Sequence, residues 1–135
     1  MRYVLDTSAL SAGMRRDEAL SDFFKAHQLG DIFTAPPAVA EIHYGIERLD
    51  HSSRKYLLLK SEADRLLAII KVLPWTSEAS QHFGVIKSDL EKTGQLIDDF
   101  DIAIGAIAMA HQCTVLTANL SHFKRITNLQ SIFWK

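Results

Sequence analysis

A carboxylate directly follows a short apolar run at the start of the chain. Tyr3, Val4 and Leu5 show no alternation with polar residues, which is typical of a strand buried on both faces. Asp6 comes at the point where that strand must end. Ligands of open parallel sheets bind outside the carboxyl ends of the strands. We therefore expect Asp6 to lie at a functional site.

Three aspartates stand together at the beginning of a long apolar segment. Asp98, Asp99 and Asp101 lead into the run IAIGAIAMA, which is apolar nearly all round and predicts a buried helix. One aspartate is enough to cap a helix, and a first-turn carboxylate gains about 0.3–1 kcal/mol from the helix dipole. Three of them repel one another, and a divalent cation relieves such repulsion most directly. Asp101 should project from the core edge of this helix.

Another acidic residue lies in the segment APPAVAEIHYGIERL. Pro36 and Pro37 suit the first turn of a helix. Glu41 comes one residue before Ile42, on the margin of the apolar stripe rather than opposite it. Its position alone is equally consistent with a solvated surface glutamate.

Polar residues also follow a later apolar strand, in the segment TVLTANLSHF. Thr117 and Asn119 are either simple turn residues or donors of hydroxyl and amide groups to a water or a phosphate. If Asp6, Glu41 and Asp101 converge with them, the hard oxygen ligands suit Mg²⁺ or Mn²⁺. Metal-assisted hydrolysis of phosphodiester bonds uses such a site and needs no nucleophile from the protein.

These side chains must be positioned by short strands that alternate with longer helical patterns. The strand signals are YVL, DIFTA, KVL, TVLT and, near the C-terminus, SIFW. Apolar residues spaced by three and four predict helices over 19–26, 39–49, 56–70, 77–92 and 102–111. This alternation predicts an α/β fold with a central, mainly parallel sheet. With no linker or repeat, residues 1–135 should form a single domain.

The composition narrows the class of protein. A formal net charge of −1 argues against a broad basic face for passive nucleic-acid binding, but not against a nuclease whose acidic site is offset by metal ions. The single cysteine, Cys113, excludes an internal disulfide. Asp6 interrupts any signal-peptide pattern, and IAIGAIAMA is far shorter than the roughly 20 residues of a membrane helix. We expect a cytoplasmic protein without membrane contact.

Four segments together resemble the PIN-domain family, and specifically the VapC-type ribonuclease toxins of toxin–antitoxin pairs. They are LDTSAL, AEIHYGIERL, GQLIDDFDIAIGAIAMA and VLTANLSHFKRI, in the family's order and spacing over nearly the whole chain. The resemblance implies a PIN-like three-layer α/β/α fold. It also implies a Mg²⁺- or Mn²⁺-dependent endoribonuclease whose catalytic metal ligands match Asp6, Glu41 and Asp101.

The resemblance also assigns supporting positions. Ser8 matches a residue that hydrogen-bonds the acidic cluster, and Thr117 has a similar place. Asp98 is a second choice for the site. Asn119 occupies a position at which many relatives carry a fourth acidic residue, which bears on a second metal ion. The partners implied are a structured RNA substrate such as tRNA or rRNA, a cognate antitoxin protein and a second copy in a homodimer.

Other functions fit the sequence less well. Phosphoaspartate phosphatases need a second aspartate two residues after the first, where this chain has Ser8. Nucleotide-binding motifs such as GxGxxG and GxxxxGK[ST] are absent. The six histidines show no metal-ligand spacing, although His122 lies beside the expected site and is a candidate for touching RNA. A catalytically inactive PIN fold that binds RNA or protein is the main alternative.

Overall fold

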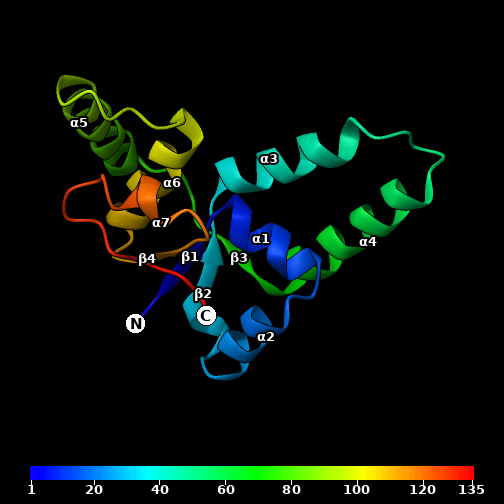
Figure 1. The fold of residues 1–135 in the computed structure, drawn as a ribbon. Coiled ribbons are helices and arrows are strands. Elements are labelled where there is room, and N and C mark those ends of the chain that lie inside the picture. The colour runs from blue at the N-terminus through cyan, green and yellow to red at the C-terminus, as the bar shows by residue number, and fades with distance from the viewer.

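A parallel sheet of five short strands organises the chain (Figure 1). The computed structural model describes residues 1–135. The strands are β1 (Tyr3–Leu5), β2 (Ile32–Thr34), β3 (Lys71–Val72), β4 (Thr114–Leu116) and β5 (Ser131–Ile132). They lie in the order β3-β2-β1-β4-β5, and every neighbouring pair is parallel. The expected α/β fold and all five strand signals are confirmed.

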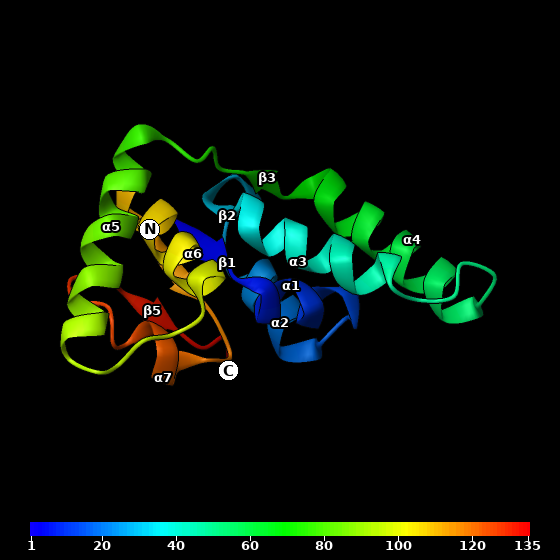
Figure 2. The ribbon, with the colours of Figure 1, turned by 90° about the horizontal axis from the view of Figure 1, so that it is seen from above.

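Helices cover both faces of this sheet. They are α1 (Thr7–Met14), α2 (Glu18–Lys25), α3 (Pro36–Glu47), α4 (Arg54–Ile69), α5 (Ser77–Lys92), α6 (Asp99–Ala110) and α7 (Leu120–Phe123), with a 3₁₀ turn at Leu29–Asp31. Right-handed crossovers place the helices that lead from β1 to β3 on one face and those that lead from β3 to β5 on the other. Figures 1 and 2 show these two groups, α1–α4 and α5–α7, on opposite sides of the strands.

The sequence patterns predict five of the seven helices and miss α1 and α7. Helix α1 begins directly after β1, with Asp6 as its N-cap. The signal was present, because an aspartate is followed by buried Ala9, Leu10 and Met14 at helical spacing. Helix α7 spans one turn, which is too short for a periodic pattern.

Helix α6 forms the centre of the second layer. Every residue from 102 to 108 is buried, as the all-round apolar pattern predicts. The helix contacts β1, β4, α5 and α7. Because its first turn reaches the carboxyl ends of the strands, α6 also contacts α3 from the opposite layer.

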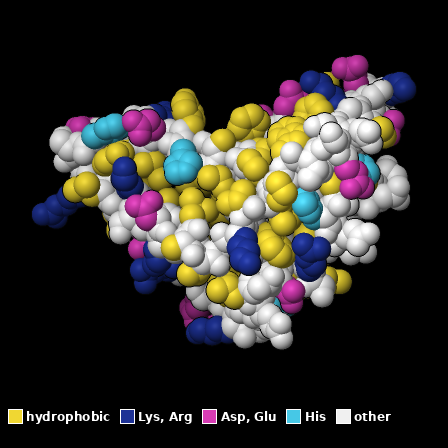
Figure 3. Space-filling view, turned by 180° about the vertical axis from the view of Figure 1, so that it is seen from behind, with side chains coloured by type: hydrophobic (Ala, Val, Ile, Leu, Met, Phe, Trp, Pro, Cys, Tyr) yellow, Lys and Arg dark blue, Asp and Glu magenta, His cyan; other side chains and the backbone are white.

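The outer surface is apolar over part of one side. Seen from behind, hydrophobic side chains gather between two projecting lobes, with few charges among them (Figure 3). Trp75, Val72 and Phe100 are large apolar side chains that remain 45%, 46% and 43% exposed. None of the helices has the length and apolar character required to cross a membrane.

Gly105 allows the C-terminal segment to approach α6 closely. A Cβ atom at this position would lie 2.8 Å from Ile126 Cδ1 and 3.2 Å from Leu129 Cδ2. A Cβ atom at Gly84, in the middle of α5, would meet nothing within 4 Å. The two glycines therefore differ in packing although both are helical.

Valine at these two positions separates packing from helix propensity. We expect Gly105→Val to lower the free energy of unfolding by about 1–3 kcal/mol, because added methyl groups overpack the contact with Ile126. Gly84→Val should change it by only about 0.5 kcal/mol, since the propensity change is the same and the space is open. Urea unfolding followed by circular dichroism measures both. Equal losses in the two variants would contradict this account of Gly105.

Candidate active site

Asp6 lies where the strand order reverses. The chain moves outward from β1 to β2 and β3, and then returns to β4 on the other side of β1. Leu5 pairs with Leu116, so the residues that follow these two strands are neighbours. The Asp6 backbone N–H donates to the Leu116 carbonyl at 3.2 Å. Reversal points of this kind form the ligand-binding crevices of open α/β sheets.

The Asp6 carboxylate is held by three hydrogen bonds. Ser8 Oγ and the Ala9 N–H donate to Oδ1 at 2.6 and 2.9 Å, and Thr117 Oγ1 donates to Oδ2 at 2.6 Å. The two hydroxyls are fixed in turn, because Ser8 Oγ accepts from the Ala118 N–H and Thr117 Oγ1 accepts from the Asn119 N–H. A carboxylate has about four lone-pair positions, so the free position of Asp6 is on Oδ2.

Burial makes Asp6 an unusual acid. The residue is 1% exposed, and this desolvation raises the pKa of its carboxyl above the ordinary value. The hydrogen bonds from Ser8, Thr117 and Ala9 oppose that rise in pKa but do not cancel it. The fold therefore holds a carboxylate whose charge it only partly compensates.

Asp101 is a second, partly buried acid near the carboxyl ends of the strands. It lies in the first turn of α6 with a side chain that is 15% exposed. Desolvation raises the pKa of its carboxyl, a hydrogen bond from His122 lowers it, and the negative charges of Asp6 and Asp98 raise it further. The negative charge of Asp6 therefore acts on the Asp101 carboxyl, although the two residues belong to different elements of the fold.

Glu41 is fixed by a residue that the sequence analysis does not single out. Thr7 Oγ1, in the first turn of α1, donates to Glu41 Oε1 at 2.6 Å. Thr7 directly follows Asp6, so the bond joins the Glu41 side chain on α3 to the same corner of the sheet. Two of the lone-pair positions of Glu41 remain on Oε2.

The remaining predicted residues occupy the rim. Asp98 is exposed and caps α6, because its Oδ1 accepts the Phe100 N–H at 2.8 Å, as expected of an N-cap. Asp99 turns to α5, where its carboxylate lies 3.1 Å from Lys87 Nζ. Asn119 is exposed at the start of α7 and makes no side-chain cap.

The arrangement fits a cation held by few protein ligands. No group of three or more His, Cys, Asp or Glu side chains lies close enough together to hold a metal ion. The expectation that Asp6, Glu41 and Asp101 form one ligand set therefore stays a prediction. Mg²⁺ commonly binds through one or two carboxylates and keeps several waters. Asp6 and Asp101 are carboxylates of this kind, and the charge of Asp6 raises the pKa of Asp101.

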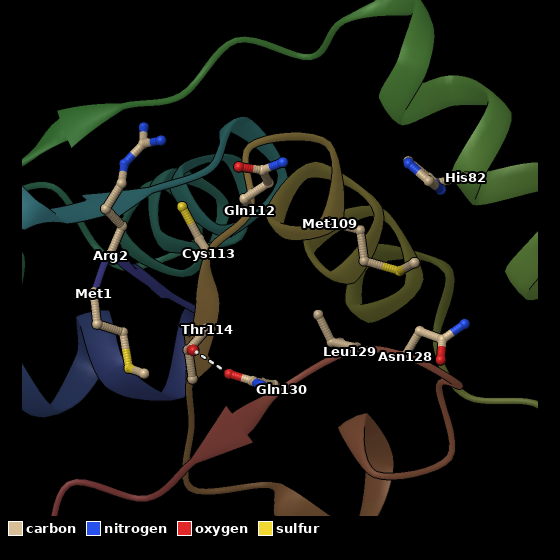
Figure 4. A pocket seen from close by; sticks show the side chains of 10 residues that line it. All are labelled: Met1, Arg2, His82, Met109, Gln112, Cys113, Thr114, Asn128, Leu129 and Gln130. Atoms are coloured by element: carbon tan, nitrogen blue, oxygen red, sulfur yellow. Dashed lines mark hydrogen bonds between the residues drawn. The ribbon is translucent and has the colours of Figure 1, made fainter.

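The largest cavity lies at the amino ends of the strands. It measures about 700 Å³, and Arg2, Cys113, Thr114 and Gln130 are among its lining residues (Figure 4). These residues precede or begin β1, β4 and β5, whereas the carboxylates follow the strands. Cavity size therefore does not locate the acidic site.

Sequence comparison places this architecture in a family. The profile of the PIN domain matches residues 3–129. The chain belongs to the PIN-domain family. Ribonuclease VapC2 of Haemophilus influenzae is 30% identical to this PIN domain over 136 residues, which cover 99% of this chain and 98% of that one. A tRNA(fMet)-specific endonuclease VapC of Shigella flexneri is 24% identical over 99% of this chain and 98% of its own.

Solved structures confirm the fold of this PIN domain. The toxin–antitoxin complex VapBC2 from Rickettsia felis, bound to a DNA fragment from its promoter, contains a chain that superposes with a TM-score of 0.88. The match covers 100% of both chains at 24% identity. A chain of VapBC-1 from nontypeable Haemophilus influenzae gives a TM-score of 0.83 at 25% identity, over 99% and 98% of the two chains. The expected PIN-like three-layer α/β/α fold is thus confirmed.

The buried acid predicts a pH-dependent cost in stability. An aspartate whose pKa is raised by folding binds its proton more readily in the folded state, so stability falls as pH rises from the ordinary pKa through the raised one. In EDTA at neutral pH, Asp6→Asn should therefore melt at a higher temperature than the wild type. The new amide nitrogen can take the Oδ2 position and donate to Thr117 Oγ1, while Oδ1 still accepts from Ser8 Oγ and the Ala9 N–H.

The size of this gain should depend on pH. It should shrink toward pH 4, where the wild-type carboxyl becomes protonated as well. Thermal melts across pH 4–8 measure it, with Asp99→Asn on the exposed rim as the matched control. A gain of the same size at every pH would mean that the Asp6 charge is not its source.

Proposed function

We propose that this PIN domain is a metal-dependent endoribonuclease that acts as the toxin of a toxin–antitoxin pair. The observation that carries the proposal is the buried, hydroxyl-held Asp6 beside Asp101 at the reversal point of the sheet. The names of the relatives, ribonuclease VapC2 and tRNA(fMet)-specific endonuclease VapC, support the reaction class.

The side chains divide into ligands and positioning groups. Asp6 and Asp101 would hold Mg²⁺ or Mn²⁺, with Glu41 as the third carboxylate. When bound, the ion activates water and neutralises the phosphate during phosphodiester hydrolysis. Ser8 and Thr117 keep the free lone pair of Asp6 aimed at the site.

Two rim residues have smaller roles in this proposal. Asp98 adds negative charge near Asp101 while it caps α6. Asn119 places a neutral amide where many VapC relatives carry an acid, which favours a site with few carboxylates.

The partners follow from the same reading. Structured RNA, with tRNA or rRNA as the leading class, is the proposed substrate, and a cytoplasmic location is part of the same proposal. The toxin–antitoxin complexes among the structural relatives support a cognate antitoxin as partner. The apolar side shown in Figure 3 offers surface for protein contacts, including those of a homodimer.

Cleavage of RNA tests the proposal directly. We expect purified protein with Mg²⁺ or Mn²⁺ to cut total cellular RNA into discrete fragments, and EDTA to prevent this. Asp6→Asn and Asp101→Asn should each lower the rate at least about 100-fold, because loss of a ligand should cost no less than the 10–100-fold typical of outer-shell partners. Asp99→Asn, which removes a carboxylate paired with Lys87, is the matched control.

Three results would count against parts of this proposal. Full activity of Asp6→Asn would remove the acidic site from the reaction. Activity that persists in EDTA would remove the metal. Folded wild-type protein that binds Mn²⁺ and RNA without cutting any RNA would favour the alternative of a PIN fold retained for binding.

A further inference from the structure

His122 makes a contact that the reaction scheme above does not use. Its Nδ1 lies 3.2 Å from Asp101 Oδ2, and the two residues are 21 positions apart in the chain. The imidazole comes from α7, which follows the β4 strand, whereas Asp101 lies in the first turn of α6. The contact therefore joins α6 and α7 near the carboxyl ends of the strands, where Asp6 also lies.

The position of His122 is set by its neighbours in α7. Phe123, the last residue of α7, is fully buried, and Ile126, three residues beyond this helix, is 3% exposed. At the other end of the turn, Thr117 Oγ1 accepts the Asn119 N–H while it donates to Asp6. Because both ends of this segment are anchored, the His122 ring is held against α6 by the fold and not by its own hydrogen bond alone.

The contact differs from the other histidine–carboxylate pairs of the chain. His51, in the turn after α3, pairs with Glu47, and His82 pairs with Glu78 within α5. Both pairs have i,i+4 spacing, and these glutamate side chains are 71% and 65% exposed. The Asp101 side chain is 15% exposed. A hydrogen bond to a largely buried carboxylate restricts that carboxylate far more than one to a solvated glutamate.

We propose that His122 is a positioning residue that orients the Asp101 carboxylate toward the bound cation. An ionised carboxylate only accepts hydrogen bonds, so Nδ1 carries the hydrogen and donates it to Oδ2. This fixes the rotation of the carboxylate and leaves Oδ1 free as a metal ligand. Outer-shell donors of this kind commonly change metal affinity by about 10–100-fold. The inference rests on the proposed metal site.

The test measures metal affinity without RNA. Mn²⁺ is titrated into the full chain, and free Mn²⁺ is followed by its electron paramagnetic resonance signal. We expect His122→Ala to raise the Kd for Mn²⁺ about 10–100-fold. His122→Asn should recover most of the affinity, because its amide nitrogen takes a place close to Nδ1. His122→Gln extends its amide toward the Nε2 position and should not recover it.

Matched controls separate this role from folding and from the metal proposal itself. His82→Ala removes an exposed helical pair and should leave the Kd unchanged. Melting temperatures in EDTA check that each variant is folded, which we expect because the His122 side chain is 42% exposed. Unchanged Mn²⁺ affinity in His122→Ala, or recovery by Gln and not by Asn, would overturn the positioning role. Wild-type protein that binds no Mn²⁺ would overturn the metal site as well, and so would be recognised as a different failure.

Discussion

The hydrogen bonds to the Asp6 carboxylate set the geometry at the carboxyl ends of β1 and β4. It receives hydrogen bonds from Ser8 and Ala9 on its own side and from Thr117 on the side of β4. The two hydroxyls are themselves held by backbone N–H groups of residues 118 and 119. One buried charge thus ties the β1–α1 junction to the β4–α7 junction. Buried polar networks rigidify a structure when every member is satisfied, and no buried side-chain polar atom here lacks a partner.

The carboxylates of Glu41 and Asp101 are held in a similar way, each by a side chain from another element. Thr7 fixes Glu41 from α1, and His122 contacts Asp101 from α7. In each case the partner comes from a different element than the carboxylate, so the packing of helices against the sheet sets the orientation of the acid. Precise placement of this kind is what a functional site requires of its supporting residues.

The burial that orients these carboxylates also lowers the free energy of unfolding. Desolvation raises the pKa of both Asp6 and Asp101, and the negative charge of Asp6 raises that of Asp101 further. Active sites are the places where proteins keep such unfavourable groups, because a ligand of opposite charge restores the balance. The acidic residues follow the strands, and they lie apart from the cavity at the amino ends of the strands.

The sequence by itself determined the architecture and singled out the polar residues that follow the strands. Unbroken apolar strands such as YVL and TVL specify a buried parallel sheet, and the apolar run of α6 specifies a central helix. Both follow from the sequence because the local pattern of apolar residues indicates which segments are buried. Asp6 at a strand end and Asp98 as an N-cap follow from the same local rules.

Only the tertiary structure decided which side chains meet. Thr7 with Glu41 and His122 with Asp101 are pairs separated by 34 and 21 positions, and no local pattern distinguishes them from surface residues. Helix α7 is only one turn long, so the sequence shows no helical periodicity there, although this helix positions His122 for its contact with Asp101. Such contacts depend on strand order and helix packing over the whole chain, so local propensity could not reveal them.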